Sequence, residues 1–281
     1  MIKVTTDSTC DLSEELRAQH DIVVVPISIQ FGTECYEDGI AMDGTTLVRK
    51  IHELGILPTT SQPSAGQFER YYRRLAEVGA TDILSLHVTA RLSGTLQSAE
   101  LAKQLLQGQV RVHPFDSACA SAGLGFMAVE ASRMAAAGQS VAKILARLDT
   151  IRSRMNIVLT LEDLRFAQMS GRVGKMQSSL ASLLNIKPIA LLENGVVDVI
   201  EKVRTRQKAI ERLLETLAER VGTSAPVNLA VVHANALDEG RELLERACAR
   251  FTCQETFLAD LTTSLLVHLG PGTLGVIAYR V

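Results

Sequence analysis

At 281 residues the chain is long enough for two domains, although one large domain is also open. Hydrophobic residues make up 47% of it and charged residues 21%, a balance typical of a globular protein. The 29 basic and 31 acidic residues nearly cancel, aromatic residues are only 4%, and tryptophan is absent. Neither phosphate neutralisation nor base stacking therefore favours a nucleic-acid partner.

The first half of the chain alternates short apolar runs with helical patterns. Strands are expected at residues 2–5, 22–26, 83–88 and 110–114. Helices are expected at residues 13–19, 45–54, 65–78, 95–107 and 124–137. A capping box, Ser64-Ala65-Gly66-Gln67, opens the third of them. Such alternation predicts βαβ units and a mostly parallel sheet with flanking helices, as in a Rossmann-like α/β domain.

The second half has a different pattern, that of a mixed α/β domain. Strands are expected at residues 157–161, 186–193, 196–203, 227–233 and 276–281. Helices are expected at residues 162–169, 178–184, 208–220 and 238–250. Asn194-Gly195 separates two of the strands and predicts a hairpin. We therefore expect two domains, residues 1–153 and 154–281.

The five cysteines are odd in number and include no Cys-x-x-Cys, which favours reduced thiols in a cytoplasmic protein. The opening residues, Met1-Ile2-Lys3-Val4, lack the apolar core of a signal peptide. No uncharged apolar run reaches the ~18 residues of a membrane span. The six histidines are scattered without His-Glu-x-x-His spacing, so no metal site is expected, and His87 and His233 fit core positions in strands.

Two polar turns carry the main functional signal: Thr59-Thr60-Ser61-Gln62-Pro63-Ser64 and Ala90-Arg91-Leu92-Ser93-Gly94-Thr95. Each leads into a predicted helix, whose free N–H groups and dipole favour an anion. A third polar turn is His268-Leu269-Gly270-Pro271-Gly272. Together they predict a site for a carboxylate or phosphate. A serine that only caps its helix, with no ligand, is the simpler alternative.

Two glycine-rich motifs do not support a nucleotide. Gly270-x-Gly272-x-x-Gly275 matches the dinucleotide fingerprint in spelling, but a strand and not a helix is expected after it. Gly171-Arg172-Val173-Gly174-Lys175 lacks the spacing of a phosphate loop and is typical of a basic loop. We expect a tight turn at the first motif and no nucleotide cofactor at either.

Ser93 and His268 could also be a nucleophile and its base, with Asp7 as a third member. The nucleophile-elbow spelling Gly-x-Ser-x-Gly is absent. From the residues alone, the sequence predicts an α/β protein with an anion site and leaves binding and acyl-transfer chemistry open.

The chain resembles the DegV family over nearly its whole length. The resemblance lies in Val4-Thr5-Thr6-Asp7-Ser8-Thr9-Cys10-Asp11-Leu12, Val25-Pro26-Ile27-Ser28-Ile29, Tyr36-Glu37-Asp38-Gly39, Thr60-Ser61-Gln62-Pro63-Ser64, Leu92-Ser93-Gly94-Thr95, Asp116-Ser117, Ser170-Gly171-Arg172, Leu184-Asn185-Ile186-Lys187-Pro188, Lys202-Val203-Arg204-Thr205 and His268-Leu269-Gly270-Pro271-Gly272. Cys10 stands where a small residue is usual in the family, and Ser170 where glycine is usual. Neither departure removes a polar group that the site would need.

The resemblance implies two α/β domains that hold a long-chain fatty acid between them. It implies the fatty acid-binding subunit of a bacterial fatty acid kinase, without catalysis or a cofactor of its own. The acyl carboxylate would contact Thr60, Ser61, Ser93, Gly94 and His268. Arg172 and Arg204 would lie near the carboxylate end and contact the kinase subunit. A transient membrane contact, a Ser93/His268-dependent acyl hydrolase or transferase, and a carrier of another small carboxylate stay open.

Overall fold

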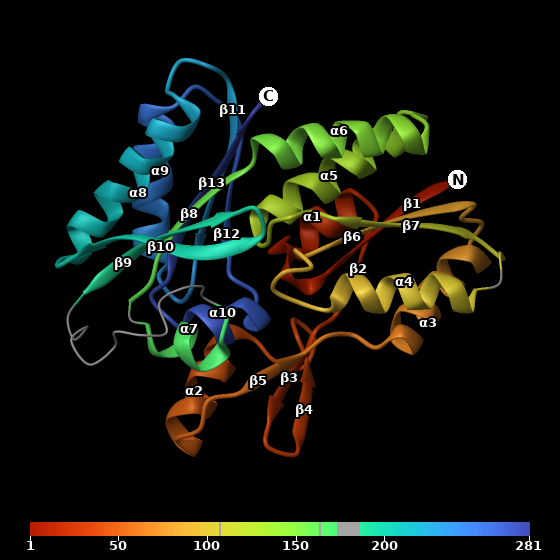
Figure 1. Ribbon diagram of the computed structural model, residues 1–281, viewed down its shortest axis with the longest axis horizontal. Coiled ribbons are helices and arrows are strands. Elements are labelled where there is room, and N and C mark those ends of the chain that lie inside the picture. The colour runs from red at the N-terminus through yellow and green to blue at the C-terminus, as the bar shows by residue number, and fades with distance from the viewer. Residues whose placement is uncertain (107, 163, 173–185) are drawn as a thin grey trace.

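The computed structural model describes residues 1–106, 108–162, 164–172 and 186–281. These residues form a four-stranded, a six-stranded and a three-stranded sheet. Figure 1 shows the four-stranded and six-stranded sheets side by side, with the small sheet below them. The chain is therefore an α/β protein, as its sequence predicts.

The first large sheet is parallel throughout and has the strand order β2-β1-β6-β7. Its strands are β1 (Ile2–Asp7), β2 (Ile22–Val25), β6 (Asp82–His87) and β7 (Arg111–Asp116). Adjacent residues of β6 point to opposite faces: Ile83 packs with α3 (Ala65–Glu77) and α4 (Thr95–Leu105), and Leu84 packs with α5 (Ala122–Ala136) and α6 (Val141–Arg154). A strand that is buried on both faces is typical of a doubly wound sheet. The predicted parallel sheet with flanking helices is confirmed.

The second large sheet is mixed and has the order β10-β9-β8-β13-β11-β12. Its strands are β8 (Asn156–Thr160), β9 (Lys187–Glu193), β10 (Val196–Val203), β11 (Val227–His233), β12 (Cys253–Asp260) and β13 (Leu274–Arg280). All neighbours are antiparallel except β11 and β12. The predicted hairpin is confirmed, since β9 and β10 pair around Asn194 and Gly195, which both have positive φ.

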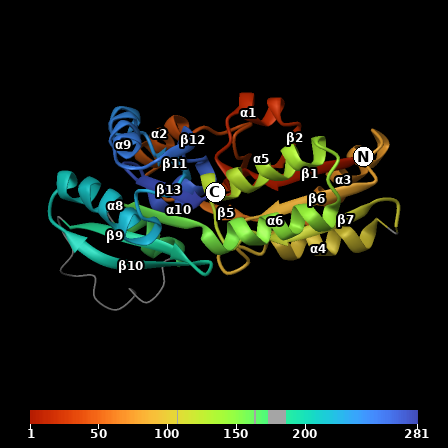
Figure 2. The same cartoon turned by 90° about the horizontal axis from the view of Figure 1, so that it is seen from above.

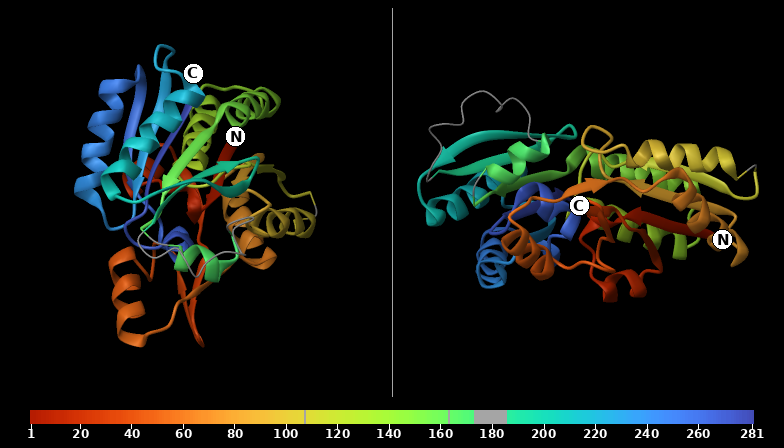
Figure 3. Two further views of the ribbon diagram at one scale, coloured as in Figure 1. Left: turned by 60° about the vertical axis from the view of Figure 1, so that its left-hand side comes forward. Right: turned by 90° about the horizontal axis from the view of Figure 1, so that it is seen from below.

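The two faces of this mixed sheet have different neighbours. Val158 and Val276 pack against α8 (Arg206–Val221) and α9 (Leu237–Arg250), which lie on the outer face (Figures 1 and 3). Ile157 and Ile277 belong instead to a hydrophobic cluster shared with the parallel sheet and α5. Figure 2 shows the two large sheets meeting near the middle of the molecule. The inner face of the mixed sheet is thus available to form a site with the first half.

The small sheet has the order β4-β3-β5 and lies next to both halves. It contains β3 (Ser28–Phe31), β4 (Glu34–Glu37) and β5 (Thr59–Ser61), and α2 (Gly44–Leu54) lies between the last two in sequence. The remaining elements are η1 (Ser8–Cys10), α1 (Glu14–Gln19), α7 (Arg165–Ser170) and α10 (Thr263–Leu269). The small sheet matters for function because β5 carries one of the predicted polar turns.

The sequence patterns missed several elements. No helix was expected at α6 or α10, and no strand at β3, β4, β5 or β12. The three strands of the small sheet have only three or four residues each, too few to establish a period. The helix expected at 162–169 begins only at Arg165, and the one expected at 178–184 lies outside the described residues. Within the described residues, no helix is long and apolar enough to cross a membrane.

Candidate functional site

A cavity of about 760 Å³ lies between the parallel sheet, the small sheet, α10 and the inner face of the mixed sheet. Its volume is within the range of small-molecule sites. One end is polar and the rest of the wall is mostly apolar. The described residues lining the polar end are Thr60, Ser61, Gln62, Ser64, Ser93, Gly94, Ser98, Arg172, Ser264 and His268. The structure therefore brings the three polar turns into one wall.

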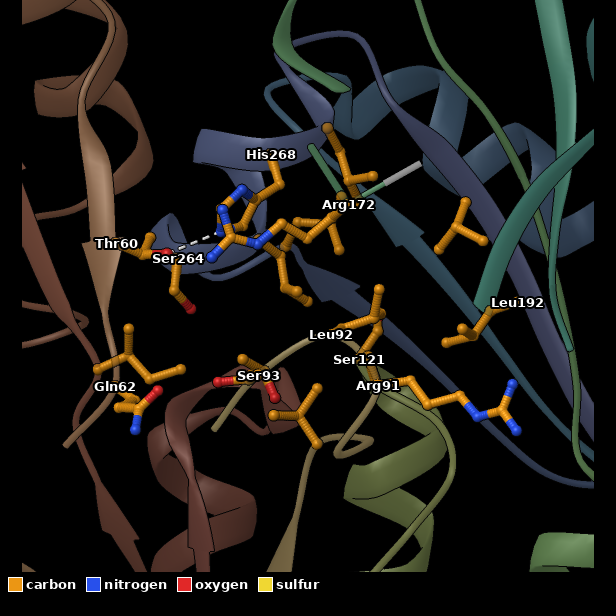
Figure 4. Close-up of a pocket in the computed structure, with 18 of the residues that line it drawn as sticks. Thr60, Gln62, Arg91, Leu92, Ser93, Ser121, Arg172, Leu192, Ser264 and His268 are labelled. Atoms are coloured by element: carbon orange, nitrogen blue, oxygen red, sulfur yellow. Dashed lines mark hydrogen bonds between the residues drawn. The ribbon is translucent and has the colours of Figure 1, made fainter. Parts of the chain in front are cut away.

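Five site residues predicted from the sequence come from three separate segments of the fold. Thr60 and Ser61 lie on β5, Ser93 and Gly94 follow β6, and His268 lies on α10. Figure 4 shows Thr60, Ser93 and His268 around the same end of the cavity. The Thr60 hydroxyl and the His268 Nε2 are 2.8 Å apart. All five residues line the cavity, as the anion site requires.

Local backbone geometry leaves donors free beside Ser93. Gly94 is the N-cap of α4 and has no side chain to bond the helix's first N–H groups. The Ser93 hydroxyl takes up one of them, that of Thr95 at 3.3 Å, and also lies 2.8 Å from the Thr95 hydroxyl. A Cβ at Gly94 would lie 2.4 Å from the Gln62 Oε1, so a larger residue there would have to displace the Gln62 side chain. The helix N-terminus consequently faces the cavity with donors suited to an anion.

His268 is held as a neutral imidazole. Burial, together with the nearby positive charge of Arg172, lowers its pKa to about 4. The Nδ1 atom is buried without a hydrogen-bond partner among the described residues, whereas Nε2 meets Thr60. A neutral ring can share a proton with Thr60, which leaves the Thr60 hydroxyl able to donate to an anion.

The two arginines predicted from the resemblance lie in different environments. Arg172 is exposed, lines the polar end of the cavity and donates to the Ser170 carbonyl at 2.6 Å. Arg204 is also exposed but follows β10 and is not among the described residues that line the cavity. The structure thus brings Arg172, and not Arg204, to the polar end of the cavity.

The rest of the cavity wall is largely aliphatic and is shared by the two halves of the chain. The first half supplies Ile27, Val88, Ala90, Leu92 and Ala120. The mixed sheet and the chain around α10 supply Ile157, Leu159, Leu192, Val197, Val232, Leu261, Leu265, Leu269 and Ile277. Such a surface can accept a long apolar group because burying it removes hydrocarbon from water.

The alternative catalytic arrangement is not assembled among the described residues. The Ser93 hydroxyl meets Thr95, and the His268 Nε2 meets Thr60. Asp7 accepts hydrogen bonds from Thr9, His87 and the Val88 N–H. None of these bonds involves His268. A serine nucleophile needs its base within hydrogen-bond reach, so this geometry does not favour acyl-transfer chemistry at Ser93.

His87 is instead part of a buried polar chain in the parallel sheet. Its Nε2 is 2.8 Å from the Ser85 hydroxyl and its Nδ1 is 3.2 Å from the Asp7 Oδ2. All three residues are fully buried, and none lines the cavity. The predicted core positions of His87 and His233, which is 2% exposed, are confirmed.

Other sequence expectations have structural outcomes as well. The turn at Gly270 and Gly272, with φ of 82° and 76°, leads directly into β13, so the predicted tight turn is confirmed. Of the basic loop at 171–175, residues beyond Arg172 lie outside the described residues. All five cysteines are free. No metal-binding cluster of three His, Cys, Asp or Glu side chains occurs within the described ranges.

Sequence reasoning missed several polar residues of the wall, among them Thr9, Ser121 and Ser264. Ser264 lies on the unpredicted helix α10. Ser121 has φ of 59° and ψ of −151°, a backbone conformation that residues other than glycine rarely adopt. No local pattern marks these positions, because the cavity forms only where distant segments meet.

The fold and the site together define a class: an α/β protein with a parallel and a mixed sheet, a small third sheet, and a cavity between them that is polar at one end and largely aliphatic elsewhere. The family model described as "Uncharacterised protein, DegV family" matches residues 1–281. The chain is 33% identical over 276 residues to protein DegV of Bacillus subtilis (strain 168), and the matched region covers 98% of each chain. This chain belongs to the DegV family.

Solved structures of the family share the fold. A DegV family protein from Thermus thermophilus, described by its fatty acid binding, matches with a TM-score of 0.93 and 34% identity over 100% of this chain and 99% of that one. DegV of Bacillus subtilis, described as a fatty acid-binding protein, matches with a TM-score of 0.90 and 32% identity over 100% and 99% of the two chains. The α/β architecture predicted from the sequence is that of these relatives.

Proposed function

We propose that this protein binds one long-chain fatty acid, with the carboxylate at the polar end of the cavity and the acyl chain along the aliphatic wall. The observation that carries the proposal is the division of one cavity into a polar end and a long apolar remainder. The fatty acid binding ascribed to relatives at 32% and 34% identity supports it. Each buried CH₂ contributes ~0.8 kcal/mol, so the tail supplies most of the affinity.

The polar end offsets the cost of taking a carboxylate out of water. An ionised group loses its hydration on burial and needs hydrogen-bond donors in return. Thr60, Ser61 and Ser93 supply hydroxyls, and Gly94 is the N-cap of a helix with no side-chain cap of its own. Neutral His268 supports the Thr60 hydroxyl through its Nε2. Hydrogen bonds to an ionised oxygen are about twice as strong as neutral ones.

The protein presents the bound carboxylate to a separate kinase subunit, which forms the acyl phosphate, and has no catalysis of its own. Arg172 supports this role, since it is exposed at the polar end of the cavity. Arg204 extends the kinase contact along the exposed surface after β10. Residues 1–153 and 154–281 act as two domains around the ligand. The protein works in the cytoplasm, with at most transient contact with a membrane.

Native mass spectrometry of protein purified from bacterial cells tests the binding. We expect an added mass of one fatty acid, identified by lipid extraction, and its replacement by added oleic acid. Empty protein that takes up no oleic acid would contradict the proposal, and an extracted short carboxylate would favour the other carrier. Reconstitution with a cognate kinase subunit and ATP then tests acyl phosphate formation, which neither protein should support alone.

A further inference from the structure

The helix that carries His268, α10, is hydrogen-bonded to the first half of the chain at both of its ends. At its start, the Thr262 N–H donates to the Asp11 Oδ1 at 2.8 Å, and the Thr263 hydroxyl donates to the Met42 carbonyl at 3.1 Å. At its end, the His268 Nε2 meets the Thr60 hydroxyl at 2.8 Å. The position of His268 therefore depends on how the first half holds the start of α10.

Asp11 joins three segments that are distant in sequence. It follows η1, its Oδ1 accepts from Thr262 at the start of α10, and its Oδ2 accepts from the Ser121 hydroxyl just before α5. Asp11 and Ser121 are 3% and 6% exposed. Ser121 also lines the cavity, so this junction is part of the ligand wall.

Both residues of the junction have positive φ, which aspartate tolerates better than most residues but which strains Ser121. Asp11 is left-handed, with φ of 50° and ψ of 27°, and Ser121 combines φ of 59° with ψ of −151°. Strained residues persist where surrounding interactions determine them, and here the two residues bond each other. The strain thus points to a junction whose geometry is needed.

Burying the Asp11 carboxylate at this place also costs free energy. The pKa of Asp11 is raised to about 7, because burial and the second carboxylate, Asp38, outweigh the lowering effect of the hydrogen bonds from Ser121 and Thr262. A buried carboxylate of this kind depends on its two donors. A simple apolar contact would have filled the same space without that requirement.

We propose that Asp11 is a positioning residue of the carboxylate site: by holding the start of α10 against Ser121, it sets where His268 stands relative to Thr60. This inference rests on the proposed fatty acid binding. Asp11 itself does not line the cavity, so its effect on a ligand must pass through α10 and Ser121.

A double-mutant cycle with oleic acid as the probe separates positioning from general stability. Asp11→Ala should weaken oleic acid binding about tenfold, and Asp11→Asn should restore most of it, because an amide can still accept from Thr262 and donate to Ser121. In a His268→Ala background, Asp11→Ala should change the affinity less than about threefold. Asp21→Ala is the matched control: Asp21 also has positive φ, is exposed, pairs with Lys3 and lies outside the cavity wall, so its loss should leave the affinity unchanged.

NMR of the His268 ring tests the role of Asp11 without any ligand. The ¹⁵N resonances of the His268 ring in the ligand-free protein should move in Asp11→Ala and return in Asp11→Asn. Should Asp11→Ala not fold, Ser121→Gly suits the local backbone and removes one of the Asp11 donors, and it should move the same resonances. Unchanged resonances in the folded variants, or the same loss of affinity with and without His268, would overturn the role of Asp11. If wild-type protein binds no oleic acid, the proposed function fails, and the resonances still decide the role of Asp11.

Discussion

The Thr60 hydroxyl lies 2.8 Å from the His268 Nε2, although 208 positions separate the two residues in the chain. One belongs to a three-residue strand of the small sheet and the other to a short helix near the C-terminus. Their contact places a hydroxyl and a neutral imidazole side by side at the polar end of the cavity. The consequences can be tested residue by residue.

Removing a hydroxyl from the polar end should weaken fatty acid binding while leaving the fold intact. A hydrogen bond to a charged group is worth ~1.5–3 kcal/mol, which corresponds to roughly ten- to a hundredfold in affinity. We expect such losses for Ser93→Ala and for Thr60→Val, which keeps the shape of the side chain. Titration with oleic acid measures them.

Ser140→Ala is the matched control for these hydroxyls. Ser140 caps α6 by accepting from the Lys143 N–H and does not line the cavity. Its loss should lower the free energy of unfolding by ~1 kcal/mol and leave the affinity as it was. An unchanged affinity in Ser93→Ala would instead remove Ser93 from the site.

The buried His268 should make the ligand-free protein less stable in acid. Its pKa is lowered to about 4 in the folded protein, against an ordinary value near 6.5. The unfolded chain therefore takes up this proton first, and stability is lost as the pH falls from about 6.5 toward 4. The loss should reach about 3 kcal/mol from this residue.

Urea unfolding at several pH values checks the contribution of His268. The free energy of unfolding of His268→Gln should fall less steeply between pH 6.5 and pH 4 than that of the wild type. The same change in His52→Gln, an exposed residue near the end of α2, should leave the slope unaltered. Parallel curves for wild type and His268→Gln would show that the histidine is not buried as described.

Arg172 and Arg204 should matter more for the kinase than for the fatty acid. Exposed arginine contributes little to stability, but its planar fork suits recognition of carboxylates and phosphates. Each Arg→Ala variant can be reconstituted with a cognate kinase subunit, ATP and oleic acid. Acyl phosphate formation should fall while oleic acid affinity holds.

The position of the two arginines allows a difference between them to be detected. Arg172 lines the cavity, and its positive charge lowers the pKa of His268. Arg204 does not line the cavity. A parallel fall in oleic acid affinity for Arg172→Ala would assign Arg172 to the carboxylate site. If neither variant changes phosphorylation, both residues are simply solvated charges.

Gly275 should be required for the cavity wall to accept an acyl chain. It lies on β13 between cavity-lining neighbours, and a Cβ there would stand 2.9 Å from the Val232 Cγ2. Gly275→Ala should therefore crowd the wall, cost ~1–3 kcal/mol of stability and weaken oleic acid binding. Gly66→Ala on α3 is the control, since a Cβ there meets nothing within 4 Å, and it should keep full affinity. Equal affinities in the two variants would place the acyl chain elsewhere.

The sequence by itself determined the regular elements whose hydrophobic pattern extends over many residues. The strands around Ile83 and Val227 follow from continuous apolar runs, which suit strands buried on both faces. The helices that pack on them follow from a period of 3.6, and the hairpin follows from Asn194-Gly195. Hydroxyl-rich turns before predicted helices also predicted Thr60 and Ser93 as anion contacts, and the structure places both in the wall of one cavity.

Only the tertiary structure decided how these pieces meet. The small sheet and α10 are too short for a period, and their positions depend on partners such as Asp11 and Thr60 from elsewhere in the chain. The same holds for Ser121, whose backbone conformation is stabilised by a residue 110 positions away. The resemblance placed both Arg204 and Arg172 near one end of the site, yet of these two only Arg172 lines the cavity. Local energetics fixes which face of an element is buried, but a cavity between sheets is set by long-range packing, which no window of the sequence contains.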